Sequence, residues 1–585
     1  MKYRSYKPHS CLRSLCLRMS APLFTVVILS LSAPAIWAGS ATWNGNPVDN
    51  QWYNPNNWTP ATVPDGPTDI ATFGTTSQPA ITISDSSDHA TVLNGITFNS
   101  NASTYILTVP STQNNLSFMG NGVVNNSSQT QNFVINGNGV NDVSFTDATA
   151  GNNVSYQFVG AQSDLDFHGS ATAGSASFTC EYAYVSFFDD ASAGNATFTL
   201  NGGSHLNFLS STGNDGANGT FILNGSDTRY SFMDCDRTVF AHATFTVNGT
   251  SGLASNYVYV SSEVADAGNS TFTVNGAIDA SHFPGLVRIQ YDANPGSATL
   301  VANPGLNGGA GGKLSWVTIT RNRARVELFG SGNGDVTNGT FDATLITGPH
   351  NDISVGSLEG TGLVELGTAA LSIGTNDLDT TFAGTIHDAG GGTNGSGSLT
   401  KTGTGILTLS GANTYTGKTT VVAGTLLVTN RTGSATGTGP VIINGGVLGG
   451  TGKISGAVTV GSATRFGTIS PGLAGRAGRL TISRPITFKQ FGIYNADLDS
   501  TRVTADQVVA TGVTIGSGAT INVTDLGAAV LPSGTVLTII NNRAAIPISG
   551  TFGNLADGST LTVGSNTYLV SYEGGTGNDL TLTVQ

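Results

Sequence analysis

Residues 398–428 read SLTKTGTGILTLSGANTYTGKTTVVAGTLLV, and this stretch decides the fold that we expect. It holds short runs rich in Val, Leu, Ile and Thr at 406–409, 420–422 and 425–428, each closely followed by a Gly or Asn. Such runs are typical of β-strands separated by tight turns. The spacing between them is too short for crossover helices. We therefore expect successive coils of the chain to stack on one another.

Four pieces of this stretch, LTKTG, LTLSGANTYTG, TTV and AGTLLV, follow one another in a fixed order. In order and spacing they resemble the passenger-associated transport repeat, also called the autotransporter-associated β-strand repeat. Looser similarity extends from Asp352 to about Gly472. The resemblance implies rungs of a right-handed parallel β-helix that help a passenger to fold during secretion, and it implies no catalytic residue.

A second, internal repeat occupies residues 151–303. Its units end in an aromatic or aliphatic residue, and these residues recur in steps of 20, 23, 24, 27 and 28 residues, at Phe178, Phe198, Phe221, Phe245, Phe272 and Leu300. Steps of variable length indicate loop insertions, which a β-helix tolerates and a propeller does not. We expect these residues to stack coil over coil, roughly 4.8 Å apart. Turn asparagines follow most units, and we expect them to hydrogen-bond between coils, at Asn201, Asn224, Asn248 and Asn275.

The predicted fold is all-β: a right-handed parallel β-helix, or β-solenoid, with N- and C-terminal β caps. We expect a signal peptide at 1–38, an N-terminal cap and first coils at 39–150, internal β-helix repeats at 151–345, the autotransporter-associated repeat region at 346–472, and C-terminal coils with a β cap at 473–585. No amphipathic barrel follows before Gln585. We therefore expect export by another route or with a partner chain.

The leader has a basic beginning and an apolar core at 23–29, which is typical of a secretory signal. Ala33-Pro34-Ala35 fits a cleavage site, and Ala38 is the other candidate. The core is short for a membrane span, although a retained anchor is the alternative, and no later stretch is long and apolar enough to span a membrane. The leader predicts a secreted or outer-surface protein.

The formal net charge is -13, and without the leader 18 basic residues face 36 acidic ones. This balance argues against nucleic acid or an anionic membrane as a partner, because both attract a basic surface. Cys11 and Cys16 lie in the leader, which leaves Cys180 and Cys235. Free thiols are favoured for this pair, and a disulfide is the alternative. No Cys/His spacing predicts a metal site, and no cofactor is expected.

Three tryptophans cluster near the start of the mature chain, at Trp43, Trp52 and Trp58, among several asparagines. The favoured interpretation is a cap whose rings cover the apolar end of the first coil. The alternative is a glycan-binding platform, because aromatic faces beside amides suit sugars.

No catalytic motif occurs: the sequence lacks GxSxG, HExxH and the phosphate loop. Glycosidases need two carboxylates, and the candidate pairs are Asp164/Asp166, Asp189/Asp190, Asp234/Asp236, Asp377/Asp379 and Asp497/Asp499. We interpret them as solvated turns or strand faces; cation binding by Asp234/Asp236 or Asp497/Asp499 is the alternative. Residues 574–579, GGTGND, match the front of one calcium nonapeptide, and a single copy builds no stacked calcium coil.

Arg321, Arg323 and Arg325 alternate along one stretch, which we interpret as an outward strand face, with an acidic-glycan patch as the alternative. Together these features predict a secreted or cell-surface structural or adhesin-like β-helix passenger without catalytic activity. Its expected partners are extracellular glycans or cell-surface components, and an export partner. The alternative function is a carbohydrate-binding or polysaccharide-degrading β-helix protein.

Overall fold

A computed structural model of the chain describes residues 39–84, 90–110, 115–137, 142–159, 162–209, 215–225, 231–234, 239–250, 256–261, 266–290, 293–316, 322–331, 336–346, 351–388 and 396–585. The predicted leader and its cleavage sites lie outside these residues. Ala38–Gln585 forms one compact unit, and the domain divisions within it stay a prediction.

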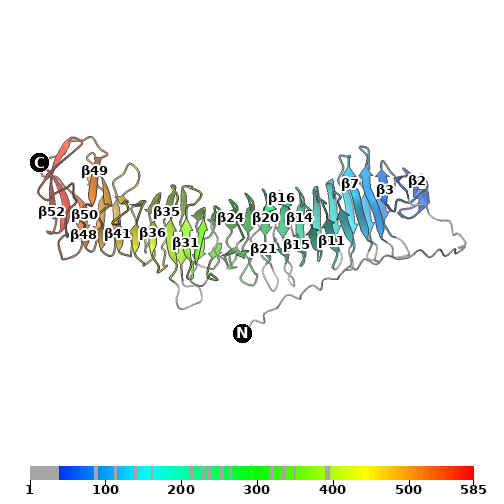
Figure 1. Ribbon diagram of the computed structural model, residues 1–585, viewed down its shortest axis with the longest axis horizontal. Helices are drawn as coiled ribbons and strands as arrows, with labels where there is room; N and C mark the ends of the chain where they lie inside the picture. Colours follow the sequence, from blue (N-terminus) through cyan, green and yellow to red (C-terminus); the bar gives the residue numbers. More distant parts are fainter. Residues whose placement is uncertain are drawn as a thin grey trace, which may run out of the picture. The chain divides into compact units, whose positions relative to one another are not determined.

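The described chain consists of β-strands and turns, and most strands pair in parallel with strands of the preceding and following coils. Three such ladders form the sides of a β-solenoid, called here sides 1, 2 and 3. Figure 1 shows strands of neighbouring coils side by side in the order of the sequence. Among the described residues, one short helical segment occurs, the 3-10 turn η1 (Pro55–Asn57). The predicted all-β parallel β-helix is therefore confirmed.

Side 1 runs through nearly the whole solenoid. Its strands are β4 (Ala80–Thr82), β6 (Ile106–Val109), β8 (Gln131–Ile135), β10 (Asn152–Phe158), β12 (Ser175–Glu181), β14 (Thr197–Asn201), β17 (Thr220–Leu223), β20 (Thr244–Val247), β22 (Thr271–Val274), β24 (Thr299–Ala302), β26 (Arg325–Leu328), β29 (Ser357–Gly360), β32 (Thr380–Phe382), β35 (Ile406–Leu409), β37 (Thr425–Val428), β39 (Val447–Gly450), β42 (Gly467–Pro471), β45 (Gly492–Asp499) and β49 (Thr520–Asp525), with β46 (Thr504–Ala505) antiparallel to β45.

Side 2 is a 16-stranded sheet in the first two thirds of the chain. Its strands are β2 (Trp58–Thr59), β1 (Ala41–Trp43), β3 (Gly66–Phe73), β5 (Thr91–Phe98), β7 (Leu116–Asn125), β9 (Val143–Thr146), β11 (Asp164–His168), β13 (Tyr184–Phe188), β15 (His205–Leu209), β18 (Phe232–Asp234), β21 (Tyr257–Ser261), β23 (Leu286–Gln290), β25 (Lys313–Trp316), β27 (Thr340–Asp342), β30 (Leu363–Glu365) and β33 (Thr385–His387).

Side 3 changes character along the chain. In the early coils its described pairings are isolated bridges, such as Thr149 to Thr172 and Thr172 to Ser192, and the short pair β16 (Asp215–Ala217) and β19 (Val239–Phe240). From residue 352 onward it is an eight-stranded sheet. The strands of that sheet are β28 (Asp352–Val355), β31 (Ala370–Ile373), β34 (Ser398–Lys401), β36 (Thr419–Val421), β38 (Val441–Ile443), β41 (Val458–Val460), β44 (Ile486–Phe488) and β48 (Val513–Ile515).

The predicted aromatic ladder is present on side 1. Phe178 pairs in register with Phe198, Phe198 with Phe221, Phe221 with Phe245 and Phe245 with Phe272. Their ring centroids lie 4.6, 5.7, 5.1 and 4.1 Å apart, with the rings stacked. All five rings are buried. Phe198, Phe221 and Phe245 therefore each lie between two phenylalanine rings, which is the stacking that the spacing predicted.

The predicted asparagine ladder is also present, at the end of the same strands. The side-chain amide of Asn224 donates to Asn201 Oδ1 at 3.0 Å, that of Asn248 donates to Asn224 at 2.6 Å, and that of Asn275 donates to Asn248 at 2.6 Å. Asn303 continues the ladder to Asn275 at 2.7 Å. Each amide in the middle both donates and accepts, so polar groups at the corner stay satisfied from coil to coil.

The stretch 398–428 forms four strands, β34 to β37, and its coils stack as predicted. The additional strand is Ser398–Lys401, in which Leu399 and Lys401 both face the core. Because one of the two inward residues is a lysine, the strand does not show the alternation of apolar and polar residues that predicts a β-strand. This explains why the strand was not predicted. Lys401 Nζ donates to the carbonyl oxygens of Thr402 at 2.5 Å and Gly403 at 3.2 Å, and burial lowers the Lys401 pKa.

The C-terminal cap is a change from parallel to antiparallel pairing. A seven-stranded sheet begins with parallel coils and ends in an antiparallel meander, in the order β40 (Lys453–Ile454), β43 (Arg479–Ile482), β47 (Gln507–Ala510), β50 (Val536–Asn542), β53 (Asp579–Val584), β52 (Asn566–Gly574) and β51 (Thr560–Val563). Antiparallel strands close the ladder locally, so the last coil needs no further parallel neighbour.

Asp506 ties this end of the solenoid together. Its carboxylate accepts the backbone N–H of Gly478 at 2.7 Å and that of Asp497 at 3.1 Å. The residue is fully buried, and burial raises the pKa of Asp506 to about 7 even though both N–H donors favour the charged form.

We expect Phe198→Ala to lower the free energy of unfolding by about 3–5 kcal/mol, because the removed ring leaves a cavity between two rings. The measurement is urea denaturation followed by circular dichroism. Thr199→Ala, the next residue on the same strand with its side chain facing outward, is the matched control, and we expect a change near zero. Equal losses in both variants would contradict the ladder.

We expect Asp506 to make the protein more stable at pH 5 than at pH 8. The folded carboxyl keeps its proton up to about pH 7, whereas the unfolded carboxyl loses it near 3.8, so this contribution is lost as the pH rises through 7. Thermal denaturation at both pH values checks this expectation. Asp506→Asn removes the contribution, and Glu573→Gln, at an exposed residue of the same cap, keeps it. An unchanged pH dependence in Asp506→Asn would contradict the assignment.

Candidate functional site

The three predicted tryptophans meet inside the N-terminal cap. Trp58 lies edge-on to Trp43 and Trp52, with ring centroids 5.0 and 4.8 Å apart, and all three rings contact Phe73. The indole N–H of Trp52 donates to Pro64 O at 3.0 Å, and that of Trp58 donates to Trp52 O at 2.7 Å. These contacts make the cluster a cap over the first coil.

None of the three indole rings is more than 2% exposed. A sugar stacks on an aromatic face that solvent reaches, and these rings offer no such face. This burial argues for the cap and against the glycan platform, the alternative interpretation of Trp43, Trp52 and Trp58.

The acidic pair Asp377/Asp379 holds the turn of the next coil. Asp377 Oδ1 accepts the backbone N–H of Thr404 at 2.7 Å, and Asp379 Oδ1 accepts that of Ile406 at 2.7 Å. The N–H of Thr404 is the main reason that the Asp377 pKa lies below its ordinary value. In Asp189/Asp190, Asp189 likewise accepts the N–H of Gly169, at 3.1 Å.

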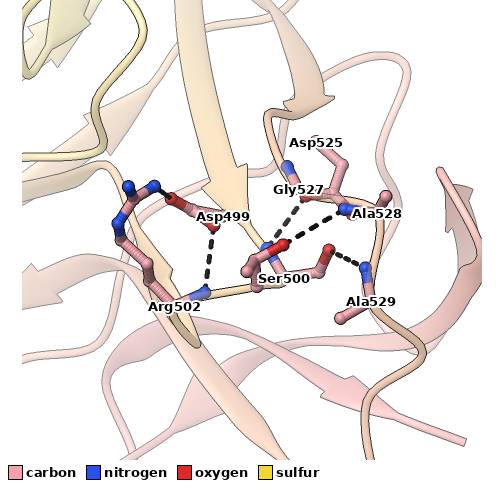
Figure 2. A network of polar contacts seen from close by, with 8 residues as sticks. Asp499, Ser500, Arg502, Asp525, Gly527, Ala528 and Ala529 are labelled. Atoms are coloured by element: carbon pink, nitrogen blue, oxygen red, sulfur yellow. Dashed lines mark hydrogen bonds and ion pairs between the residues drawn. The ribbon is translucent and has the colours of Figure 1, made fainter.

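The pair Asp497/Asp499 lies on β45, but its two carboxylates have different surroundings. Asp499 accepts Arg502 Nη1 at 2.6 Å and the Arg502 N–H at 3.0 Å, and this hydrogen-bonding lowers the Asp499 pKa. Burial raises the Asp497 pKa. Figure 2 shows Asp499 turned toward Arg502, while the neighbouring Ser500 joins the loop after Asp525. The Asp499 carboxylate is therefore engaged by Arg502.

The Ser500 contacts belong to the same cap. Asp525 Oδ1 accepts the N–H groups of Ser500 and Gly527, both at 2.9 Å, and Ser500 Oγ accepts the N–H of Ala529 at 3.1 Å. These hydrogen bonds hold successive coils together, so the network in Figure 2 has a structural role.

Of the other sequence candidates, the GGTGND stretch belongs to the C-terminal cap. In the GGTGND stretch, Asp579 accepts the Asn542 N–H at 2.8 Å and Asn578 donates to Asn542 O at 2.9 Å, so the loop closes the cap. Asp236 and Cys235 lie outside the described residues, and Cys180 is a buried free thiol. Among the residues that the structure describes, no group of three His, Cys, Asp or Glu side chains is arranged to hold a metal ion.

A cavity of about 500 Å³ opens at the start of the eight-stranded part of side 3. It spans several coils, because β28 pairs with β31 and β31 with β34. Ile353 and Leu371 point into the core there, so the alternate residues face outward. The lining residues are Asn322, Arg323, Asp352, Ile353, Ser354, Ser372, Thr375 and Thr402.

The cavity lies where the strand pairing of side 3 changes. Before this coil, the described pairings of side 3 are isolated bridges and the pair β16–β19, and β28 is the first strand of the eight-stranded sheet. The segment of Asn322 and Arg323 lies over β28: the Asn322 N–H donates to Ser354 Oγ at 3.1 Å, and Thr375 Oγ1 donates to Asn322 O at 2.6 Å. A short polar segment thus forms one wall, and the hydroxyl-bearing outer face of the sheet forms the other.

The predicted arginine series separates into two environments. Arg325, on β26, forms ion pairs with Glu327 at 2.9 Å and with Glu359, and these raise the Arg325 pKa. Arg323 is exposed at the cavity and, among the described residues, forms no ion pair. Arg321 lies outside the described residues. Neutralisation of Arg325 by two glutamates weakens the acidic-glycan alternative at this surface.

Sequence reasoning identified Arg323 but missed the other cavity residues. Asp352, Ser354 and Ser372 are ordinary outward residues of short strands, and nothing in their spacing marks them. Their grouping depends on the register between β28 and β31, which pairs Ser354 with Ser372. The nearest sequence signal is the Gly- and Asn-rich stretch around 305–339, where the repeat becomes irregular.

In the described part of the chain, no helix is both long and apolar enough to cross a membrane. The sequence pattern of the Passenger-associated-transport-repeat family matches residues 399–428. The chain is also 38% identical over 129 residues to the Adhesin BmaC autotransporter of Brucella suis biovar 1 (strain 1330), a match that covers 21% of this chain and 4% of the adhesin. The chain is therefore a β-solenoid protein that carries the autotransporter-associated passenger repeat.

Proposed function

We propose that this chain is a secreted or cell-surface, adhesin-like passenger protein without catalytic activity. The observation that carries the proposal is the passenger repeat at residues 399–428 within one continuous parallel solenoid, together with the likeness to an autotransporter adhesin. A solenoid presents a large outer surface on a scaffold whose core changes little from coil to coil. Such a scaffold suits contact with an extended surface.

The polar groups support a non-catalytic role. Asp377, Asp379 and Asp499 each accept hydrogen bonds from backbone N–H groups or from Arg502. A carboxylate that holds a neighbouring coil in this way is not free to protonate or attack a substrate. Extracellular glycans or cell-surface components are the proposed partners, and export through a partner chain belongs to the same proposal.

We expect beads coated with the purified chain to adhere to cultured host cells, because a surface passenger contacts cells through its outer face. Adherent beads are counted by microscopy after washing. Beads coated with the same mass of heat-denatured chain are the control. Equal adherence of native and denatured coats would contradict the adhesin-like function.

We expect the purified chain to release no unsaturated or reducing products from uronic-acid polysaccharides or from neutral glucans. The measurements are absorbance of unsaturated uronates and a reducing-sugar assay after prolonged incubation. Products that increase with protein concentration would overturn the non-catalytic part of the proposal and favour a polysaccharide-degrading protein.

A further inference from the structure

We propose that the cavity beside Arg323 binds a neutral sugar residue of a cell-surface glycan. This inference names a ligand class for the proposed adhesin-like protein, and its biological meaning rests on that function. The cavity volume of about 500 Å³ lies within the size range of ligand sites, about 300–1,000 Å³.

The cavity walls carry groups that both donate and accept hydrogen bonds. Ser354 Oγ accepts the Asn322 N–H and keeps its own O–H to donate, whereas Thr375 Oγ1 donates to Asn322 O and keeps its lone pairs. Ser372 adds a hydroxyl directly beside Ser354 on the neighbouring strand. Sugar hydroxyls also donate and accept, so alternating wall groups of this kind match them.

The two charged side chains in the described lining, Arg323 and Asp352, favour a ligand without net charge. Arg323 supplies donors only and Asp352 supplies acceptors only, and both side chains are exposed at the cavity. No ion pair joins Arg323 to Asp352 among the described residues, so both groups remain available to neighbouring sugar hydroxyls. An anionic sugar would gain from Arg323 but would also meet the like charge of Asp352.

Other ligand classes fit the cavity less well. Ile353 is the one apolar residue in the described lining, and it is 1% exposed. Its side chain belongs to the core, so the described lining offers no apolar floor. A metal ion would need several His, Cys, Asp or Glu ligands, and Asp352 is the single such residue among the described lining. A polar, uncharged ligand rich in hydroxyl groups can hydrogen-bond to more of the lining side chains than a metal ion or an apolar ligand can.

The test is saturation-transfer NMR on the purified chain with D-glucose, D-galactose, D-mannose and N-acetyl-D-glucosamine, and with D-galacturonic acid as the charged probe. Arg323→Gln removes the guanidinium, and Ser372→Phe fills the cavity from an outward position. Matched controls are Arg465→Gln, at an exposed arginine elsewhere, and Thr459→Phe, in the same outward column of side 3 several coils away. Thermal denaturation verifies that each variant is folded.

We expect transfer to at least one neutral sugar, and we expect both cavity variants to weaken that binding while both controls retain it. Loss of a charged hydrogen-bond donor typically weakens binding roughly tenfold to a hundredfold. Absence of transfer to every neutral sugar, or equal transfer in the wild type and both cavity variants, would overturn the site. Transfer to galacturonic acid alone would overturn the neutral class.

The outcome for the cavity is separable from the outcome for the proposed function. Bead adherence without sugar binding would overturn the cavity site and leave the adhesin-like function standing. Sugar binding at the cavity without bead adherence would overturn the adhesin-like function and leave the cavity site standing.

Discussion

In-register contact between equivalent residues of successive coils is the interaction on which this structure depends. Phe245 stacks on Phe272 with ring centroids 4.1 Å apart. Just after the end of the same strand, the side-chain amide of Asn248 donates to Asn224 of the preceding coil. Stacking of the phenylalanine rings removes apolar surface from water. The hydrogen bonds between asparagine amides satisfy polar groups at the ends of the same strands. Each coil completes the coil before it, so no single coil has a core of its own.

This dependence makes the two ends of the solenoid special. At the N-terminus Trp43, Trp52 and Trp58 cover the first coil, and at the C-terminus an antiparallel meander replaces the parallel ladder. The last layer of strands at each end would otherwise lack a neighbouring coil. The tryptophan rings cover that layer at one end, and antiparallel pairing covers it at the other. The tryptophans are consequently too buried to serve as an open sugar platform.

The polar residues follow the same logic. Asp377 and Asp379 look like an acid pair in the sequence, but each accepts a backbone N–H of the next coil. Lys401 lies inside the repeat and donates to carbonyl oxygens of the turn beside it. In a chain with so few charged residues, several of them are used to hold turns. The cavity at Arg323 lies where the isolated pairings of side 3 give way to a continuous sheet.

The local pattern of residue types along the chain was sufficient to predict the fold, but it was not sufficient to predict the cavity. Steps between Phe178 and Phe272 predicted the aromatic ladder, because a residue that recurs at every coil must occupy the same place in each layer. The strand Ser398–Lys401 escaped prediction because its second inward residue is a lysine, whose burial depends on carbonyl groups supplied by the folded turn.

The amino-acid sequence by itself determined the parallel solenoid, its ladders and its passenger repeat, since all three are periodic and periodicity is visible along a chain. Tertiary structure alone decided which polar side chains are engaged and which meet at a cavity. Ser354 and Ser372 are 18 positions apart in the chain but become neighbours through the register of β28 and β31. Strand register is set by the packing of the whole coil, so no local pattern reveals that meeting.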